Sequence, residues 1–239
     1  MVPEKPASAL AEDWRSSVRG LLNIYRVPAF WRLAPLSACV IGTAFAVHGL
    51  WAARWLTDVN GFAEGSVTYL LLVMGGGLTI GAIVIGFAAD RLRHNGVPPM
   101  VTFGMACAVF IGLQVALLGR LPLPAWLIWG VIGGFGGMTV LSYSIMGELF
   151  PPEKIGRANG ALNVLHLSMA FILQYGMGVA ASSWPAEPSG HLPFAAYRAA
   201  FALPLLLELL ALAWFVVSIT QRRRAGAIIL AGLQPEVSG

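Results

Sequence analysis

The sequence predicts an all-α membrane protein with six transmembrane helices. Hydrophobic residues fill 57% of the 239 positions and charged residues only 11%, whereas soluble domains carry about 25% charged residues. Six apolar runs are each long enough to cross the hydrocarbon layer, which needs about 20 helical residues. The alternating strands of a membrane barrel are absent. These observations exclude a water-soluble globule.

The six expected spans divide the chain into three parts. They cover residues 33–56, 67–89, 97–119, 124–147, 158–184 and 199–219. Residues 1–32 then form an N-terminal segment, 33–219 a transmembrane domain, and 220–239 a short tail. Within the spans the only charged residues are Arg54, near an end, and Glu208, near a middle.

The basic residues indicate which ends of the spans face the cytoplasm. An even number of spans puts both termini on one side, and twelve of the fifteen Lys and Arg residues belong to that side. The other three are Arg54, Arg120 and Arg198. By the positive-inside rule, both termini are cytoplasmic in a multi-pass protein of a bacterial inner membrane. The net charge of +4 follows from this topology, so we expect lipid as a partner and no nucleic acid.

The two ends of the chain have different expected structures. Apolar residues recur with helical spacing opposite Arg and Asn side chains, which predicts a basic amphipathic helix on the inner leaflet that ends at Pro28. The apolar positions are Val18, Leu21, Leu22 and Tyr25. Residues 1–13 fit an unstructured leader equally well, and the tail after Arg224 is expected to be mostly unstructured. Acidic residues near the start argue against a signal peptide.

Glycine and tryptophan positions predict helix packing and membrane contacts. Glycines four residues apart let helix backbones approach closely, and static packing is the commoner role, although such glycines also ease bending in a moving gate. The pairs are Gly77 and Gly81, Gly133 and Gly137, and Gly156 and Gly160. Tryptophans near the outer ends predict an aromatic belt. These are Trp51, Trp55, Trp126, Trp129 and Trp184.

Two connections on the basic side combine acids, bases and turn residues. The first runs from Gly86 through Asp90, Arg91 and Arg93 to Gly96, and a carboxylate beside two arginines predicts an ion-paired latch. The second runs from Glu148 to Gly160 and includes two acids, Lys154, Arg157 and a proline pair. Both motifs lie where the topology places cytoplasmic loops.

These motifs resemble those of the major facilitator superfamily. Gly86, Ala89, Asp90 and Arg91 match its loop pattern Gly-x-x-(Ala/Gly)-Asp-Arg, while the later Gly-Arg-basic part is absent. The second connection resembles the superfamily's loop between its tenth and eleventh helices, and the stretch 28–32 is similar to the start of its seventh helix. The resemblance therefore identifies the chain as the C-terminal six-helix half of such a fold.

The resemblance implies a mechanism and a partner. Members have two six-helix halves, hold the substrate between them near the midplane, and rock one half against the other. The first, second, fourth and fifth spans would line the cleft, and the third and sixth would support them. An N-terminal half or a second copy would complete the transporter, with Asp90, Arg91, Arg93, Glu148 and Arg157 as cytoplasmic latches.

Polar groups at membrane depth are the candidates for the cavity, because each needs a reason to be there. They are His48, Trp51, Arg54, Ser142, Tyr143, Asn163, His166 and Gln174. His48 and Arg54 could meet an anionic group, but each candidate could instead bond a neighbouring helix. Glu208 could carry a coupled proton. A neutral Glu208 bonded to a neighbouring helix is favoured, because the resemblance puts the sixth span away from the cleft.

The expected function is therefore secondary active transport of a small polar or anionic organic solute. The alternative is a non-transporting six-helix membrane module, or a truncated fragment that only binds a partner. Motifs of zinc proteases, P-loop enzymes and intramembrane serine proteases are absent, so we expect no enzyme. Two cysteines, Cys39 and Cys107, lie in apolar runs, and we expect no metal and no cofactor.

Overall fold

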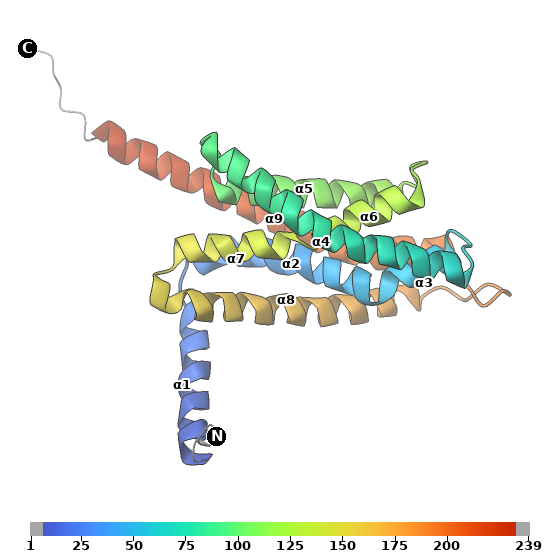
Figure 1. Ribbon diagram of the computed structural model, residues 1–239, viewed down its shortest axis with the longest axis horizontal. Helices are drawn as coiled ribbons and strands as arrows, with labels where there is room; N and C mark the ends of the chain where they lie inside the picture. The colour runs from blue at the N-terminus through green and yellow to red at the C-terminus, as the bar shows by residue number, and fades with distance from the viewer. Residues whose placement is uncertain (1–6, 233–239) are drawn as a thin grey trace, which may run out of the picture.

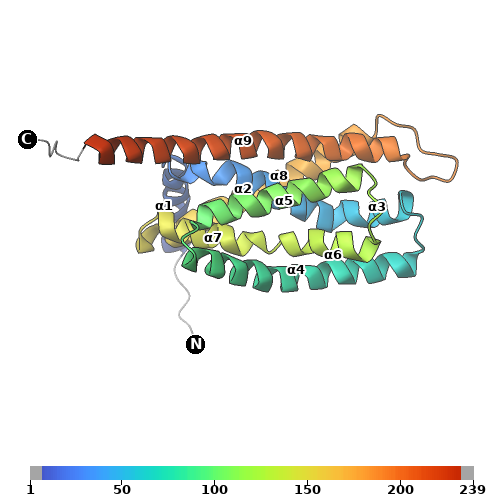
Figure 2. The same ribbon diagram turned by 90° about the horizontal axis from the view of Figure 1, so that it is seen from above.

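The structure is a bundle of six membrane-length segments, with the helix Ala7–Tyr25 lying across one end (Figures 1 and 2). The computed structural model describes residues 7–232, with the side chains of residues 14, 16 and 18–221. Six segments are long and apolar enough to span a membrane, and each overlaps one predicted run, so the prediction of six spans is confirmed. They are Ala34–Asp58, Glu64–His94, Pro99–Leu118, Ala125–Leu149, Pro152–Ala181 and Phe194–Gln221.

The spans are built from shorter elements. Over the described residues the helices are α1 (Ala7–Tyr25), α2 (Ala34–Ala46), α3 (Ala52–Asp58), α4 (Glu64–His94), α5 (Pro99–Leu118), α6 (Ala125–Phe135), α7 (Met138–Leu149), α8 (Pro152–Ala181) and α9 (Phe194–Gly232). A 3-10 turn, η1 (Phe30–Arg32), precedes α2, and a π-helical stretch, η2 (Val47–Trp51), joins α2 to α3. One end of the bundle holds α1, the α4–α5 and α7–α8 connections and the end of α9 (Figure 2). The opposite end holds the α3–α4, α5–α6 and α8–α9 connections.

Two spans are interrupted near their middles. In the first span the interruption is η2, and in the fourth it is the glycine pair Gly136 and Gly137 between α6 and α7. Helix irregularities of these kinds arise at π-helical stretches and at small residues. A Cβ atom on Gly136 would lie 3.3 Å from Cε1 of His48 in η2. The two interruptions are therefore adjacent in space.

The first span forms the centre of the bundle. Of the 18 consecutive residues with the highest hydropathy in the first span, 72% are buried, against 11% of the corresponding residues in α4. The first span packs against α8 and α9, while α4 packs mainly against α6. The largest completely covered side chains include Phe30, Leu36, Ile41, Phe103, Phe110 and Phe201. The core therefore lies between the first span and its neighbours, and α4 keeps most of its surface exposed.

Glycines allow α4 and the fourth span to touch backbone to backbone. A Cβ atom on Gly77, Gly81, Gly133 or Gly137 would collide with backbone atoms of the opposite span. The predicted close contact is therefore confirmed for these two pairs. A Cβ atom on Gly156 or Gly160 would meet nothing within 4 Å. The predicted contact at that pair is wrong for the described part of this chain.

The helix α1 runs across the direction of the spans (Figure 1). Its last residue, Tyr25, donates a hydrogen bond to the backbone oxygen of Ala161 in α8, at 2.9 Å. Burial raises the pKa of the Tyr25 hydroxyl, so the group keeps the proton that it donates. The alternative of an unstructured leader is wrong from Ala7 onward, and residues 1–6 lie outside the described part. Contact of α1 with the inner leaflet stays a prediction.

The last helix is longer than the sequence predicts. α9 continues to Gly232, so the expectation of an unstructured tail after Arg224 is wrong up to that residue. Apolar residues at 227–230 follow the three arginines at 222–224, and Pro204 lies inside the helix. Residues 233–239 lie outside the described part of the chain.

The predicted aromatic belt is wrong for three of the five tryptophans and stays a prediction for the two that are exposed. Trp126 and Trp184 are 57% and 36% exposed. Three others are at most 2% exposed and belong to the core: Trp51, Trp55 and Trp129. Trp55 contacts the Trp129, Tyr197 and Phe201 rings edge-on. Aromatic packing inside the bundle, rather than lipid contact, therefore explains these three residues.

Candidate functional site

The interruptions in the first and fourth spans place His48 near the middle of the bundle. Its ring is partly exposed and lies against Gly136. The Nε2 atom of His48 is buried and has no hydrogen-bond partner among the described residues. A buried ring nitrogen without a partner is costly in an apolar medium. His48 lies in one of the two helix breaks and against the other.

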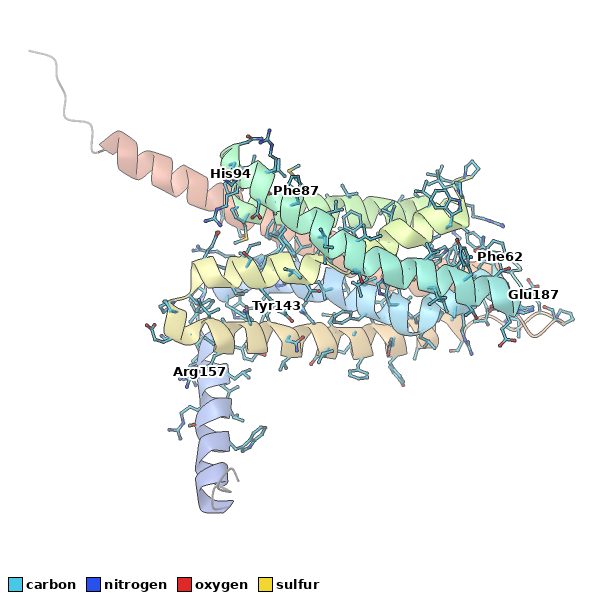
Figure 3. All side chains as sticks on the ribbon, in the orientation of Figure 1. Phe62, Phe87, His94, Tyr143, Arg157 and Glu187 are labelled. Carbon is cyan, nitrogen blue, oxygen red and sulfur yellow. The ribbon has the colours of Figure 1, made fainter. Side chains whose placement is uncertain are left out.

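A second polar group lies nearer the basic end, between α2, α7 and α8. The Tyr143 hydroxyl donates to Oδ1 of Asn163 at 3.0 Å, and Figure 3 shows Tyr143 between α7 and α8. Nε2 of His166 and Oγ of Ser37 are 2.8 Å apart. The rings of Tyr143 and His166 are 6.0 Å apart between centroids. The structure thus brings together three predicted residues from two spans.

Burial divides this second group into two kinds of residue. His166 and Ser142 are completely buried, and the Ser142 hydroxyl donates to the Thr139 oxygen of its own helix at 2.7 Å. Ser142 and Nε2 of His166 therefore bond within the chain, which was the alternative to a cavity role. Nδ1 of His166 is buried without a partner among the described residues. Tyr143 and Asn163 lie at the surface, so a group outside the chain can reach them.

The third group lies toward the opposite end, between the first span and α8. Arg54 and Gln174 line the same cavity of about 350 Å³, together with Trp51. Arg54 is exposed, whereas Trp51 is only 2% exposed and packs edge-on against Tyr197 and Phe201. Trp51 is thus mainly a core residue. The eight predicted cavity residues therefore occupy three levels of the bundle rather than one site.

The predicted latch residues lie at the basic end. Nη1 of Arg93 and Oε1 of Glu148 form an ion pair at 2.9 Å, which joins the end of α4 to the end of α7. Asp90 and Arg91 form no ion pair with any side chain that the structure describes. The pairing is thus between the two motifs rather than inside the first one.

The remaining latch positions differ in their surroundings. A Cβ atom on Gly86 would meet nothing within 4 Å. Arg157 lies where α8 begins beside α1 (Figure 3), and a Cβ atom on Gly20 would be 2.9 Å from Nε of Arg157. Gly20 therefore makes room for the arginine side chain. The Arg157 side chain lies against α1 at Gly20, and a gating role for it stays a prediction.

Glu208 lies inside the bundle, away from the three polar groups. It is completely buried, and Nε2 of Gln114 in α5 donates to its Oε2 atom at 2.5 Å. The contact joins the third span to the sixth. No cation pairs with Glu208 among the residues described. Its bond to a neighbouring helix is as expected, and its neutral state stays a prediction.

Asp58 is a polar centre that the sequence analysis did not identify. It lies at the end of α3 opposite the basic loops and accepts three hydrogen bonds from the α8–α9 region. His191 Nδ1 is 2.8 Å from Oδ1, while the Tyr197 hydroxyl and the Leu192 amide lie 2.6 and 3.2 Å from Oδ2. Ser37 and Gln114 were missed as well. No local spacing could have indicated these pairs, because each joins residues more than ninety positions apart.

Within the described side chains, no group of three or more His, Cys, Asp or Glu residues could hold a metal ion. The site therefore consists of hydrogen-bonding and cationic groups at membrane depth.

Comparison with known proteins agrees with this arrangement. A family model described as Major Facilitator Superfamily matches residues 1–174, which include the first four spans and most of α8. No curated protein matches the chain. Members of the family are transporters rather than enzymes. With its six membrane-spanning helices, the chain is a multi-pass membrane protein that belongs to the Major Facilitator Superfamily.

Proposed function

We propose that the chain is the C-terminal half of a secondary transporter for a small polar or anionic organic solute. The observation that carries this proposal is the position of Arg54 and Gln174, a cation and an amide that line one cavity between two spans. Arg54 is exposed near the end of its span, where a cation can meet an anionic group that enters from that side. His48 and the Tyr143–Asn163 pair supply further polar groups at other levels of the bundle.

The packing supports movement of this half as one body. The backbone contact between α4 and the fourth span leaves no space for sliding, and buried bonds such as His166–Ser37 join α8 to the first span. A rocking movement would therefore break contacts at the surface. The exposed ion pair between Arg93 and Glu148 joins two helices of this half and would stay intact in such a movement, so its proposed latch role is to hold the cytoplasmic ends of α4 and α7 in place for contact with the other half.

The proposal includes orientation and a partner. The basic connections lie at one end of the bundle (Figure 1), which supports cytoplasmic termini and insertion into a bacterial inner membrane. α4 and α8 are the least buried of the six spans: 11% and 28% of the 18 consecutive residues considered in each are buried. Their exposed faces are suited to an N-terminal half or a second copy. A solute would bind between the two.

Uptake into proteoliposomes tests this function. The purified chain is reconstituted at low and at high protein-to-lipid ratio, and with any N-terminal half encoded beside it. Uptake of radiolabelled benzoate, lactate and succinate is then measured. We expect uptake that depends on the second half or, for a second copy, rises per chain with protein density. Uptake by the isolated monomer would contradict the need for a second half.

A variant pair tests the latch in the same assay. Arg93→Gln and Glu148→Gln each remove the ion pair, and both should change the uptake rate in the same direction. The double variant should add nothing further, because one pair is lost in all three cases. Lys154→Gln removes a charge from the same region that forms no ion pair with any described side chain, and it serves as the control. Additive effects of the two substitutions would exclude a shared latch.

The alternative function is a six-helix module that binds a partner without transport. The wide apolar surface of α4 favours it. The two functions differ in one result: a module would form a stable complex with a second half and still give no uptake of any tested solute.

A further inference from the structure

The cavity that contains Arg54 has an unusual chemical composition. It lies between the first span and α8, next to the α8–α9 connection, and has a volume of about 350 Å³. Binding pockets for small molecules start near roughly 300 Å³. The lining residues are Leu50, Trp51, Arg54, Gln174, Gly178, Ala181, Ser182 and Leu192. One cation and one amide thus stand in a wall that is otherwise mostly apolar.

The guanidinium of Arg54 has no carboxylate partner among the described side chains. Its natural partner would be Asp58, one helical turn further along the same helix face. The two oxygens of Asp58 already accept bonds from His191, Tyr197 and the Leu192 amide, and Arg54 forms no ion pair. Arg54 therefore carries an uncompensated charge beside the cavity.

The same hydrogen bonds also fix one wall of the cavity. Leu192 lines it, and its backbone amide donates to Oδ2 of Asp58 at 3.2 Å. The loop before α9 is thereby held against the end of the first span. The wall does not depend on a ligand, as is usual for a preformed site.

The other lining residues determine which further parts of a ligand the cavity can hold beside a group bound to Arg54. The Gln174 amide nitrogen lies close to the first span, since a Cβ atom on Gly49 would be 3.1 Å from it. The Ser182 hydroxyl already donates to the Val179 oxygen. A Cβ atom on Gly178 would meet nothing within 4 Å, so this glycine leaves the space open. Leu50, Trp51 and Leu192 complete an apolar wall.

We propose that this cavity binds a small monocarboxylate with an apolar body, with the carboxylate on Arg54 and the apolar body against Trp51 and Leu192. Guanidinium and carboxylate groups match in geometry and form two parallel hydrogen bonds. The Gln174 amide supplies a further donor in the cavity wall. As a substrate site this assignment rests on the proposed function, because it names the class of solute that the transporter would take up.

Binding can be measured without transport. The full-length chain in dodecyl maltoside is tested with radiolabelled benzoate by scintillation proximity. Unlabelled benzamide and acetate are added as competitors. Benzamide lacks the charge and acetate lacks the apolar body, so we expect both to compete much more weakly than unlabelled benzoate. Absence of saturable benzoate binding at millimolar concentration would overturn the proposal.

Two variants with matched controls locate the site. Arg54→Gln should weaken benzoate binding about 10- to 100-fold, the usual effect of losing a hydrogen bond to a charged group, while Arg198→Gln, an exposed arginine of α9 outside the cavity, should change nothing. Gly178→Leu should abolish binding by filling the cavity. Gly112→Leu, another glycine with open space around it, should not. Equal effects of variant and control would overturn the assignment.

A phospholipid headgroup is the other source of an anion for Arg54. Binding is therefore repeated in nanodiscs of phosphatidylcholine. Loss of benzoate binding in the nanodiscs, with binding retained in detergent, would show that a lipid phosphate occupies Arg54 and would refute the proposal. Binding that depends on Arg54 without any uptake would refute the proposed transport but not the site. Uptake of other solutes without benzoate binding would refute the proposed site but not the proposed transport.

Discussion

Replacing Gly81 with alanine tests how the bundle is held together. Gly81 lies on α4 at its contact with α6, where a Cβ atom would be 2.5 Å from the carbonyl carbon of Gly134. Ordinary contact begins at 3.4 Å. The obstacle is backbone and cannot rotate away, so the two helices must separate by roughly 1 Å in a close-packed interior.

The expected cost follows from two opposing effects. Overpacking of this kind costs about 1–3 kcal/mol, whereas alanine in place of glycine stabilises a helix by about 0.5–1 kcal/mol. Gly75 lies on the same helix, and a Cβ atom there would meet nothing within 4 Å. Gly75→Ala should therefore show the helix effect alone. Gly81→Ala should be less stable than Gly75→Ala by about 1–3 kcal/mol.

Unfolding of the purified protein by sodium dodecyl sulfate in dodecyl maltoside measures this difference. The eight tryptophans supply the fluorescence signal. Equal unfolding free energies of Gly81→Ala and Gly75→Ala would refute the close contact between α4 and α6. A Gly75→Ala variant less stable than the wild type would show instead that the open face of α4 is covered by another part of the protein.

Three further predictions concern single polar residues. Ser37→Ala leaves a ring nitrogen of His166 buried without a partner, so the same unfolding assay should show a loss of about 1–3 kcal/mol; no loss would mean that the pair is not formed. Asp58→Asn should release the loop 182–193, seen as faster amide hydrogen exchange there than in the wild type; unchanged exchange would contradict its anchoring role. Glu208→Gln should leave uptake of benzoate normal at every pH, because the site is neutral and lies away from the cavity. A lost pH dependence would make it a proton carrier.

The spans and one helix contact could be predicted because they depend on local sequence. Hydrophobic run length alone separates the six spans. The spacing of Gly77 and Gly81 predicted a helix contact that the structure contains. The same spacing at Gly156 and Gly160 predicted a contact that the structure does not contain at these two described residues. Spacing describes one helix and carries no information about whether a neighbour lies beside it.

The site was harder to predict because it depends on which helix faces meet. The sequence placed Trp51 near an outer end, but its burial follows from contact with Tyr197 of the sixth span. Arg54 and Gln174 were both candidates, and only the fold puts them on the same cavity. Asp58 could not be identified, since its partners lie more than 130 positions away.

The polar groups of the chain fall into two classes, and this division supports the proposed function. Those with partners inside the chain, such as His166 with Ser37 and Glu208 with Gln114, join neighbouring spans and make the bundle one body. Arg54 is instead exposed and forms no ion pair with a described side chain. A cation so placed beside a cavity is free to bind an anionic group from outside the chain, as the proposed solute-binding half requires.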